Sequence, residues 1–322
     1  MRLLLGLVMI AMTAAATSAT DDARLPDRDL LALRDLDQRV ADIGYRLARA
    51  AAPFCAEHVP LSGFVLHGIE QYGAVSRDRA RVTFGLGDGL AVLVVAHGSR
   101  AEAAGLRAGD AIFAVNGHAV PATTADATAR VEATARAMEQ GAGPMISIDI
   151  ERDDRRQTIT FVADRGCATQ FWIDPSPRLS AEADGHEVEI TSAYVERAAD
   201  DAALAIVLAH ELAHNILHHR ARLDRDGAHH GLARYFGRSA SLTRAAELEA
   251  DQLSVPIAGC AGYALDDALA FREGLWRDKL ADALLRAPDH PAARQRLDTI
   301  RRAIARFKAD PAPCGDGAID RR

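Results

Sequence analysis

Beyond its first twenty residues, the chain lacks any apolar run long enough to cross a bilayer, which takes about 20 consecutive apolar residues. It also lacks an excess of positive charge, since 45 acidic residues outnumber 38 lysines and arginines and leave a formal net charge of −7 at pH 7. A chain of this charge has no electrostatic reason to bind nucleic acid or an anionic membrane. We therefore expect no nucleic-acid partner and no membrane span in the mature protein.

Residues 1–19 are predicted to be a signal peptide. An apolar stretch from Leu3 to Met12 follows the single basic residue Arg2, and small residues continue to Ala19. Cleavage is expected after Ala16 or Ala19, and the loss of Arg2 changes the formal charge to −8. An uncleaved anchor is the alternative, although the apolar run is short for a bilayer. The sequence thus favours export to the periplasm or the cell exterior.

Cysteine is also scarce. The four cysteines, in no spacing typical of a metal site, are Cys55, Cys167, Cys260 and Cys314. An even number in an exported chain indicates two disulfides, for which three pairings exist. No cysteine follows the signal peptide closely, so a lipid anchor is not supported.

What is present is the zinc-hydrolase motif His210-Glu211-x-x-His214. On an α-helix, residues four positions apart lie on one face, so both histidines can offer a ring nitrogen to one zinc ion. Glu211, about 100° round the helix, falls beside that ion, where it can accept a proton from a zinc-bound water and pass it to a leaving amine. The apolar run from Ala202 to Leu217 predicts a buried helix. A core helix with incidental histidines is the alternative.

A catalytic zinc needs three protein ligands and one open position, so a third ligand must come from elsewhere in the chain. Glu247 is the candidate. Asp251 lies one helical turn below it, where its carboxylate can accept the outer N–H of a ligating histidine, with His210 the expected partner. The sequence therefore predicts one Zn²⁺ per chain on His210, His214 and Glu247, with Asp251 as support.

These residues resemble the HtpX-like and CAAX-prenyl-endopeptidase-like zinc metallopeptidases, which form peptidase family M forty-eight, of the gluzincin kind. Besides the zinc motifs, the resemblance rests on Ala183-Asp184-Gly185 leading into Val188–Ser192, and on His290-Pro291 with Arg294. It implies that His210, His214 and Glu247 bind zinc and that Glu211 is the general base. Integral-membrane members of the family have several hydrophobic spans, and this chain departs from them in having none.

The family's similar His-Pro-x-x-Arg stretch suggests that His290 or Arg294 stabilises the tetrahedral oxyanion opposite the zinc. The alternative is that His290 caps a helix whose first residue is Pro291. Tyr194 and Tyr263 are further candidates for the oxyanion, although packing explains them as well.

The region 81–163 resembles a PDZ domain. Alternating apolar residues predict strands at Ile112–Val115, Ile146–Ile150 and Thr158–Val162, after an apolar strand at Ala91–Ala96. PDZ domains bind an extended peptide as an added strand, and the backbone amides of a glycine loop hold its terminal carboxylate. The residues expected to form that loop here are Phe84, Gly85, Leu86 and Gly87. A PDZ-shaped spacer that binds nothing is the alternative.

The resemblance also implies that the PDZ-like domain is inserted into the peptidase. Residues 20–80 would then form an N-terminal helical part of the peptidase, and residues 164–322 its zinc domain. An inserted domain leaves and re-enters its host at nearby points, which favours pairing Cys55 with Cys167, and hence Cys260 with Cys314. The helical stripe from Leu30 to Leu47 is expected to pack on the peptidase core.

Two further sequence patterns give weaker predictions. The alternating segment from His186 to Thr191 predicts a strand at a sheet edge that aligns substrate beside the metal, or an ordinary amphipathic strand. Four histidines follow the predicted zinc-binding helix: His218, His219, His229 and His230. They are expected to be exposed to solvent, and the alternative is that one of them closes the open zinc position.

The expected fold class is therefore α+β, a mainly helical gluzincin domain with a small sheet and an inserted β-rich module. The expected function is that of an exported zinc endopeptidase acting on polypeptides, such as misfolded envelope proteins, with a C-terminal peptide as the possible PDZ ligand. One alternative is a client-binding, chaperone-like protein with little proteolysis. Another is a zinc amidase that acts on a non-protein polymer such as peptidoglycan.

Overall fold

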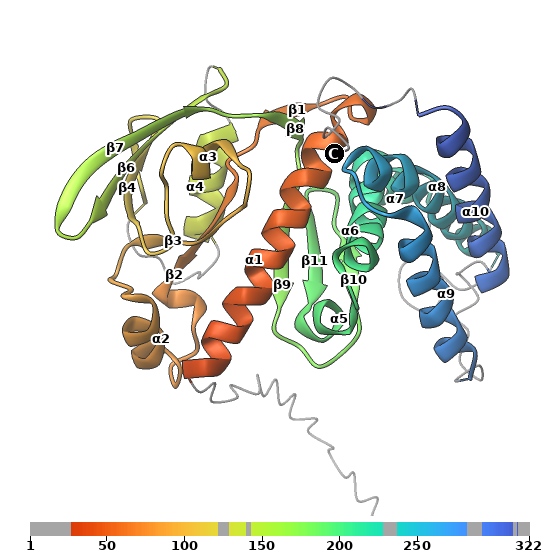
Figure 1. The fold of residues 1–322 in the computed structure, drawn as a ribbon, viewed down its shortest axis with the longest axis horizontal. Helices are drawn as coiled ribbons and strands as arrows, with labels where there is room; N and C mark the ends of the chain where they lie inside the picture. The colour runs from red at the N-terminus through yellow and green to blue at the C-terminus, as the bar shows by residue number, and fades with distance from the viewer. Residues whose placement is uncertain are drawn as a thin grey trace, which may run out of the picture.

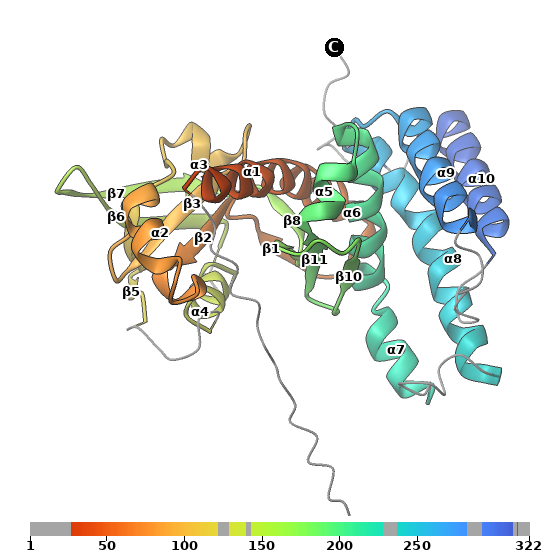
Figure 2. The same cartoon turned by 90° about the horizontal axis from the view of Figure 1, so that it is seen from below.

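The computed structural model describes residues 27–121, 129–139, 143–227, 237–281 and 292–311, together with Cys314. The predicted signal peptide lies outside these residues. Helices and strands form the mixed α and β architecture expected from the sequence, with a β-rich part and a mainly helical part on opposite sides of the long helix α1 (Figures 1 and 2). No helix of the described residues is both long and apolar enough to cross a membrane.

Helix α1 (Asp27–Ala50) joins the two parts because it is buried on more than one face. Val40 and Leu47 pack in the main core of the helical part, as the apolar stripe predicted. Tyr45 contributes to a smaller cluster with residues of the β-rich part, and Leu30 packs in another such cluster. The helix therefore belongs to both cores.

The β-rich part is built on a six-stranded antiparallel sheet in the order β2-β3-β4-β6-β7, with β5 beside β4. The predicted apolar strand is present as β3, and the strands predicted from alternation are present as β4, β6 and β7. The bounds are β2 (Phe64–Gly68), β3 (Leu90–Val95), β4 (Ala111–Val115), β5 (His118–Ala119), β6 (Met145–Arg152) and β7 (Arg155–Val162). The helices of this part are η2 (Ile69–Gln71), α2 (Arg77–Phe84), α3 (Arg100–Ala103) and α4 (Ala129–Glu139).

Strand β2 corrects the expected boundary of the β-rich part. Segment 20–80 was expected to be helical, but β2 lies within it and forms one edge of the six-stranded sheet. Four of its five residues are buried, so the strand has no polar–apolar alternation by which it could be recognised. The β-rich part therefore begins near Phe64, well before Arg81.

The chain leaves and re-enters the helical part through two paired strands. β1 (His58–Pro60) follows the short 3₁₀ helix η1 (Ala52–Phe54) and pairs antiparallel with β8 (Arg165–Cys167), with His58 opposite Cys167. The backbone N–H of Leu61 donates to the carbonyl of Asp164 at 2.8 Å. The two crossing points thus lie side by side, as an inserted domain requires.

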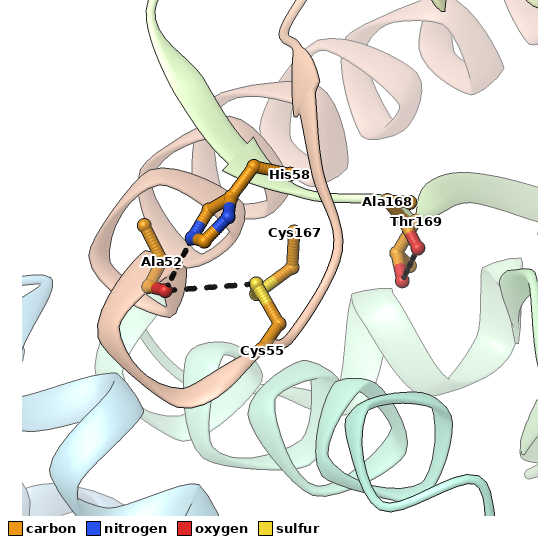
Figure 3. The surroundings of a disulfide bond; sticks show 6 residues. All are labelled: Ala52, Cys55, His58, Cys167, Ala168 and Thr169. Carbon is orange, nitrogen blue, oxygen red and sulfur yellow. Dashed lines mark hydrogen bonds between the residues drawn. A yellow bond between two sulfur atoms is a disulfide. The ribbon is translucent and has the colours of Figure 1, made fainter.

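Both predicted disulfides are present. Cys55 is bonded to Cys167, with a Cα–Cα distance of 5.8 Å, directly beside the β1–β8 ladder (Figure 3). The ring N–H of His58 at Nε2 donates to the Ala52 carbonyl at 2.8 Å in the same turn. Cys260 is bonded to Cys314, with a Cα–Cα distance of 5.3 Å, which ties the C-terminal segment to the end of α8.

A second, three-stranded sheet lies in the helical part, in the order β10-β11-β9. β11 (Glu187–Thr191) is parallel to β9 (Gln170–Asp174) and antiparallel to β10 (Ala181–Ala183). The prediction that the alternating segment forms a sheet edge is therefore wrong, because β11 is the middle strand. The edge strand that contacts the helix carrying the two histidines is β10, which is too short to show a periodic pattern.

The remaining elements are helices that surround α6 (Asp201–Ile216). Its residues from Ala202 to His210 are all buried, and the Asp200 carboxylate caps it by accepting from the N–H of Ala203 at 2.8 Å. α6 packs against α1, α8, α9 and β10. The bounds of the other helices are α5 (Ser192–Arg197), α7 (His219–Arg225), α8 (Gly237–Cys260), α9 (Leu265–Ala281) and α10 (Ala293–Ala309).

Replacement of residues 62–163 by the two-residue turn Asn-Gly should leave a folded helical part. Leu61 and Asp164 are already hydrogen-bonded across the ladder, and Asn-Gly joins antiparallel strands in a tight hairpin. The shortened chain should unfold in one cooperative thermal transition and keep both disulfides, as measured by circular dichroism and peptide mapping beside the full chain. A shortened chain with no cooperative transition would show that the β-rich part is required for the helical core.

Candidate metal centre

The two histidines of the motif lie on one face of α6, as their spacing predicts. Nε2 of His210 and Nε2 of His214 are 3.2 Å apart. His210 is buried and His214 is partly exposed, so the two ring nitrogens meet where the helix reaches the surface of the core. Burial, together with the charge of His210, lowers the pKa of His214 to about 3. Its ring is therefore neutral at physiological pH and has a lone pair for a ligand bond.

Glu247 completes the group from α8. Its Oε2 is 3.5 Å from Nε2 of His210, and its Oε1 is 3.5 Å from Nε2 of His214. Two ligand atoms at about 2.0–2.1 Å from a tetrahedral zinc are roughly 3.3 Å apart. One ligand atom from each of the three side chains lies within 4.8 Å of the other two, so the triangle formed by the predicted set His210, His214 and Glu247 could hold one metal ion.

Glu211 lies next to the triangle on α6. The pKa of its carboxyl is raised to about 7, mainly by burial and also by the nearby Glu247, although His210 and two arginines act in the opposite direction. A carboxyl group with a pKa near 7 can both accept and return a proton near neutral pH. This is the property that a general base beside a metal ion requires.

Asp251 lies beside His210, the partner that the sequence predicted for it. Its side chain is fully buried, and its Oδ1 is 3.1 Å from Nδ1 of His210. Burial alone would raise the pKa of Asp251, but the hydrogen bonds and charge of Arg296, and then those of His210, hold it well below its usual range. The carboxylate therefore stays ionised, and it lies at the ring nitrogen opposite the one that faces the triangle.

Two arginines that the sequence reading missed neutralise these carboxylates. Arg296 of α10 donates from Nε and Nη2 to the two oxygens of Asp251 at 2.6 and 2.7 Å, and its Nη1 is 2.8 Å from Oε2 of Glu247. Arg272 of α9 donates to Asp251 at 3.0 Å. Both arginines are buried. Bidentate pairing of this kind fixes the orientation of a carboxylate as well as its charge.

The structure thus corrects the assignment of the arginine on α10. Arg294, the predicted residue, is exposed, whereas Arg296 reaches the site. The signal was available in the periodicity, because Arg296 precedes the buried residues Ile300 and Ile304 at helical spacing and therefore shares their face. His290 lies outside the described residues, and its role stays a prediction.

The two tyrosines considered for stabilising the oxyanion lie in different parts of the structure. Tyr194 is buried within electrostatic reach of Arg272 and Glu211, so it lies near the site. Tyr263 instead lies under the guanidinium of Arg46 at 4.3 Å, on the side of α1. Packing is therefore the better explanation for Tyr263.

The histidines that follow α6 are also divided. His218 is exposed, and His229 and His230 lie outside the described residues. His219 is buried, and its Nδ1 is 2.9 Å from Nδ1 of His214. It therefore approaches His214 from the side opposite the nitrogen that faces the triangle, which is not where a residue that closes the open metal position would lie.

The predicted peptide loop is not at a groove. Gly85 ends α2 in the left-handed conformation (φ +64°), and Leu86 is buried in the small cluster with Leu30 and Ala91. Phe84 packs against the ring of His67, at 5.3 Å between ring centroids. The glycine motif of residues 84–87 is thus a helix end packed on the body of the protein, since a C-capping glycine and a loop glycine look alike in sequence.

An apolar groove does exist, but between other elements. It has a volume of about 110 Å³ and lies between β2, α4, α1 and β9. Val131, Ala135 and Met138 of α4 line one wall, and Phe171 of β9 lies across from them. Leu61–Phe64 also line it, just where the chain enters β2. Both β2 and β9 are terminal strands in the order of their sheets.

No protein-family model matches the chain, and no curated protein is similar to it. The assignment of the candidate metal site therefore rests on the residues themselves.

Arg296→Met should lower the free energy of unfolding by about 3 kcal/mol or more, because it leaves Asp251 and Glu247 buried without their main counter-charge. Arg294→Met is the matched control, since an exposed substitution on the same helix should change stability by less than about 0.5 kcal/mol. Urea unfolding of the metal-free proteins measures both values. If the two substitutions lowered the free energy of unfolding equally, the assignment of Arg296 to the site would be wrong.

Proposed function

We propose that this chain is an exported, zinc-dependent endopeptidase that resembles peptidase family M forty-eight. The observation that supports it most is the triangle of His210, His214 and Glu247, whose ligand atoms lie within 4.8 Å of one another and could bind one metal ion. Two nitrogens and one carboxylate oxygen form the ligand set of catalytic zinc in several peptidases. Glu211 on the next position of the same helix supplies the base that a purely structural zinc site lacks.

A zinc ion held by these three residues would polarise the scissile carbonyl and lower the pKa of an attacking water. The proton transfers are carried out by a residue of the chain itself. Glu211 accepts a proton as the water oxygen bonds to the carbonyl carbon, and returns it to the amine nitrogen as the C–N bond breaks. Asp251 and Arg296 hold His210 and Glu247 in place during these steps.

The proposed substrate is an extended polypeptide bound along β10. This strand is an edge of its sheet and contacts α6, the helix that carries both histidines, so an extended chain could pair with its outer side. Main-chain pairing of this kind recognises any extended peptide and has no counterpart in a glycan strand. It therefore favours a peptidase over the alternative of an amidase acting on peptidoglycan.

The β-rich part is proposed to be a PDZ-like module that selects substrates or partners. In this proposal the peptide lies in the groove between β2 and α4, and not at residues 84–87. An extended chain that adds to the free edge of β2 would place side chains against Val131 and Met138. A free C-terminus of that peptide would lie near Leu61–Phe64.

Export is supported by the two disulfides, which persist in oxidising compartments and are rare in the cytosol. We keep the signal peptide 1–19 and a periplasmic or secreted location as parts of the proposal. The groove is the one observation that favours the second candidate function, a client-binding protein with little proteolysis. The two functions differ in whether bound polypeptide is cut.

Glu211→Gln should retain metal binding and the fold but lower turnover by roughly 10²–10⁴-fold, because an amide cannot accept the proton of the attacking water. Glu196→Gln, on the exposed side of α5, is the matched control and should cleave like the wild type. Mass spectrometry of a denatured protein substrate, with and without a chelator, measures the cleavage. Wild-type protein that binds zinc yet produces no fragments would favour the client-binding function.

Ala135→Phe should narrow the groove and weaken the binding of long substrates. We expect KM for an unfolded protein to rise about tenfold, which corresponds to about 1.4 kcal/mol, while cleavage of a hexapeptide too short to reach the groove stays unchanged. Ala133→Phe, on the same helix but outside the groove lining, controls for damage to α4. Equal loss for both substrate lengths would mean that the groove does not bind substrate.

A further inference from the structure

The turn after α6 brings a third histidine against the metal centre. On an uninterrupted α-helix, a residue five positions after His214 would point about 140° away from it. Here α6 ends at Ile216, and His218 adopts the left-handed conformation (φ +51°) before α7 begins at His219. This change of direction returns the His219 ring to His214, and the ring is only 2% exposed.

His219 is the middle member of a chain of contacts that runs from His214 to α8. Its Nδ1 is 2.9 Å from Nδ1 of His214, and its Nε2 is 3.2 Å from Oε2 of Glu249. Arg222, one turn further along α7, donates to the same carboxylate oxygen at 2.7 Å. Glu249 is therefore held from two sides by residues of α7.

From these contacts we infer that His219, held by Glu249 and Arg222, is a positioning residue that orients His214 and fixes its tautomer for metal binding. The inference rests on the metal centre of the proposed function. A neutral histidine that ligates through Nε2 has its proton on Nδ1, which must then donate. Among the described residues, Nδ1 of His219 lies within hydrogen-bond distance of that proton and accepts it when Nδ1 itself carries none.

The donor and acceptor roles along this chain are consistent with one another. If Nδ1 of His219 accepts from His214, then its own proton resides on Nε2, where it donates to the Glu249 carboxylate. The opposite tautomer of His219 would direct an N–H at the N–H of His214 and a lone pair at a carboxylate. Glu249 thus sets the tautomer of His219, which in turn sets that of His214.

Each histidine ligand then has its own carboxylate, and both carboxylates come from α8. Asp251 contacts His210 directly, whereas Glu249 acts on His214 through one intervening ring. Glu247, the ligand, lies on the face of α8 that Asp251 shares, while Glu249 faces α7. One short stretch of this helix therefore serves all three ligands.

The test measures Zn²⁺ affinity of the full chain by competition with a chelator, independently of cleavage. His219→Ala should weaken affinity by about 10–100-fold, the usual effect of removing a partner of a metal ligand. His219→Asn keeps an acceptor where Nδ1 stood and should recover most of the loss. His218→Asn makes the same change at the adjacent exposed histidine, in a conformation that asparagine tolerates, and should leave affinity unchanged.

Circular dichroism and the thermal midpoint of the metal-free proteins separate misfolding from a local effect. If His219→Ala does not fold, Glu249→Gln supplies the test, since its side chain is 42% exposed, and it should weaken zinc binding by about tenfold. Where both variants fold, combining them should cost no more affinity than His219→Ala alone, because they interrupt the same chain of contacts.

Two results would overturn the inference: folded His219→Ala that binds zinc within about twofold of wild type, or equal losses for His219→Ala and His219→Asn. Wild-type protein that binds no zinc would instead overturn the proposed metal centre, and with it the proposed function. The failure of the positioning role and the failure of the function are thereby distinguished.

Discussion

The pairing of Arg296 with Asp251 and Glu247 is the interaction on which the arrangement of the site depends. Glu211, Glu247 and Asp251 lie together in and around a buried helix face, and carboxylates buried without counter-charge would take up protons and lose their function. Arg296 prevents this by contacting two of them at once, and Arg272 adds a second guanidinium.

This network also explains why α6, α8 and α10 must pack together for the site to exist. α6 provides the two histidines, α8 provides Glu247 and Asp251, and α10 provides the arginine, so no single segment contains the whole candidate site. The cysteine pair at Cys260 and Cys314 joins the end of α8 to the segment after α10. The disulfide therefore constrains α8 and α10, the two helices whose side chains form the buried ion pairs with each other.

Helix α1 connects the two parts of the chain because it packs against both of them. It packs on α6 through its Val40 and Leu47 face, and its Tyr45 face lines the groove beside β2. β9 has a similar position, because Phe171 lines the groove while the strand pairs with β11 of the small sheet. Two elements that line the groove therefore also pack within the helical part.

Sequence alone determined the features whose period or spacing lies within one segment. His210 and His214 share a face because they are four residues apart on an apolar helix, and Glu247 and Asp251 share a face for the same reason. The two disulfides followed from the order of the domains along the chain, once an insertion was assumed. These inferences need only local geometry and the requirement that inserted ends meet.

Tertiary structure alone decided which side chains from distant segments meet. Arg296 and Arg294 are both plausible in sequence, and only packing against α8 selects Arg296. Strands β2 and β10 carry no readable alternation, because one is buried almost throughout and the other has three residues. Gly85 proved to be a helix cap, and His219 reaches His214 only because the chain reverses at His218. In each case the deciding contact joins residues whose relation depends on a turn or an interface that local periodicity does not encode.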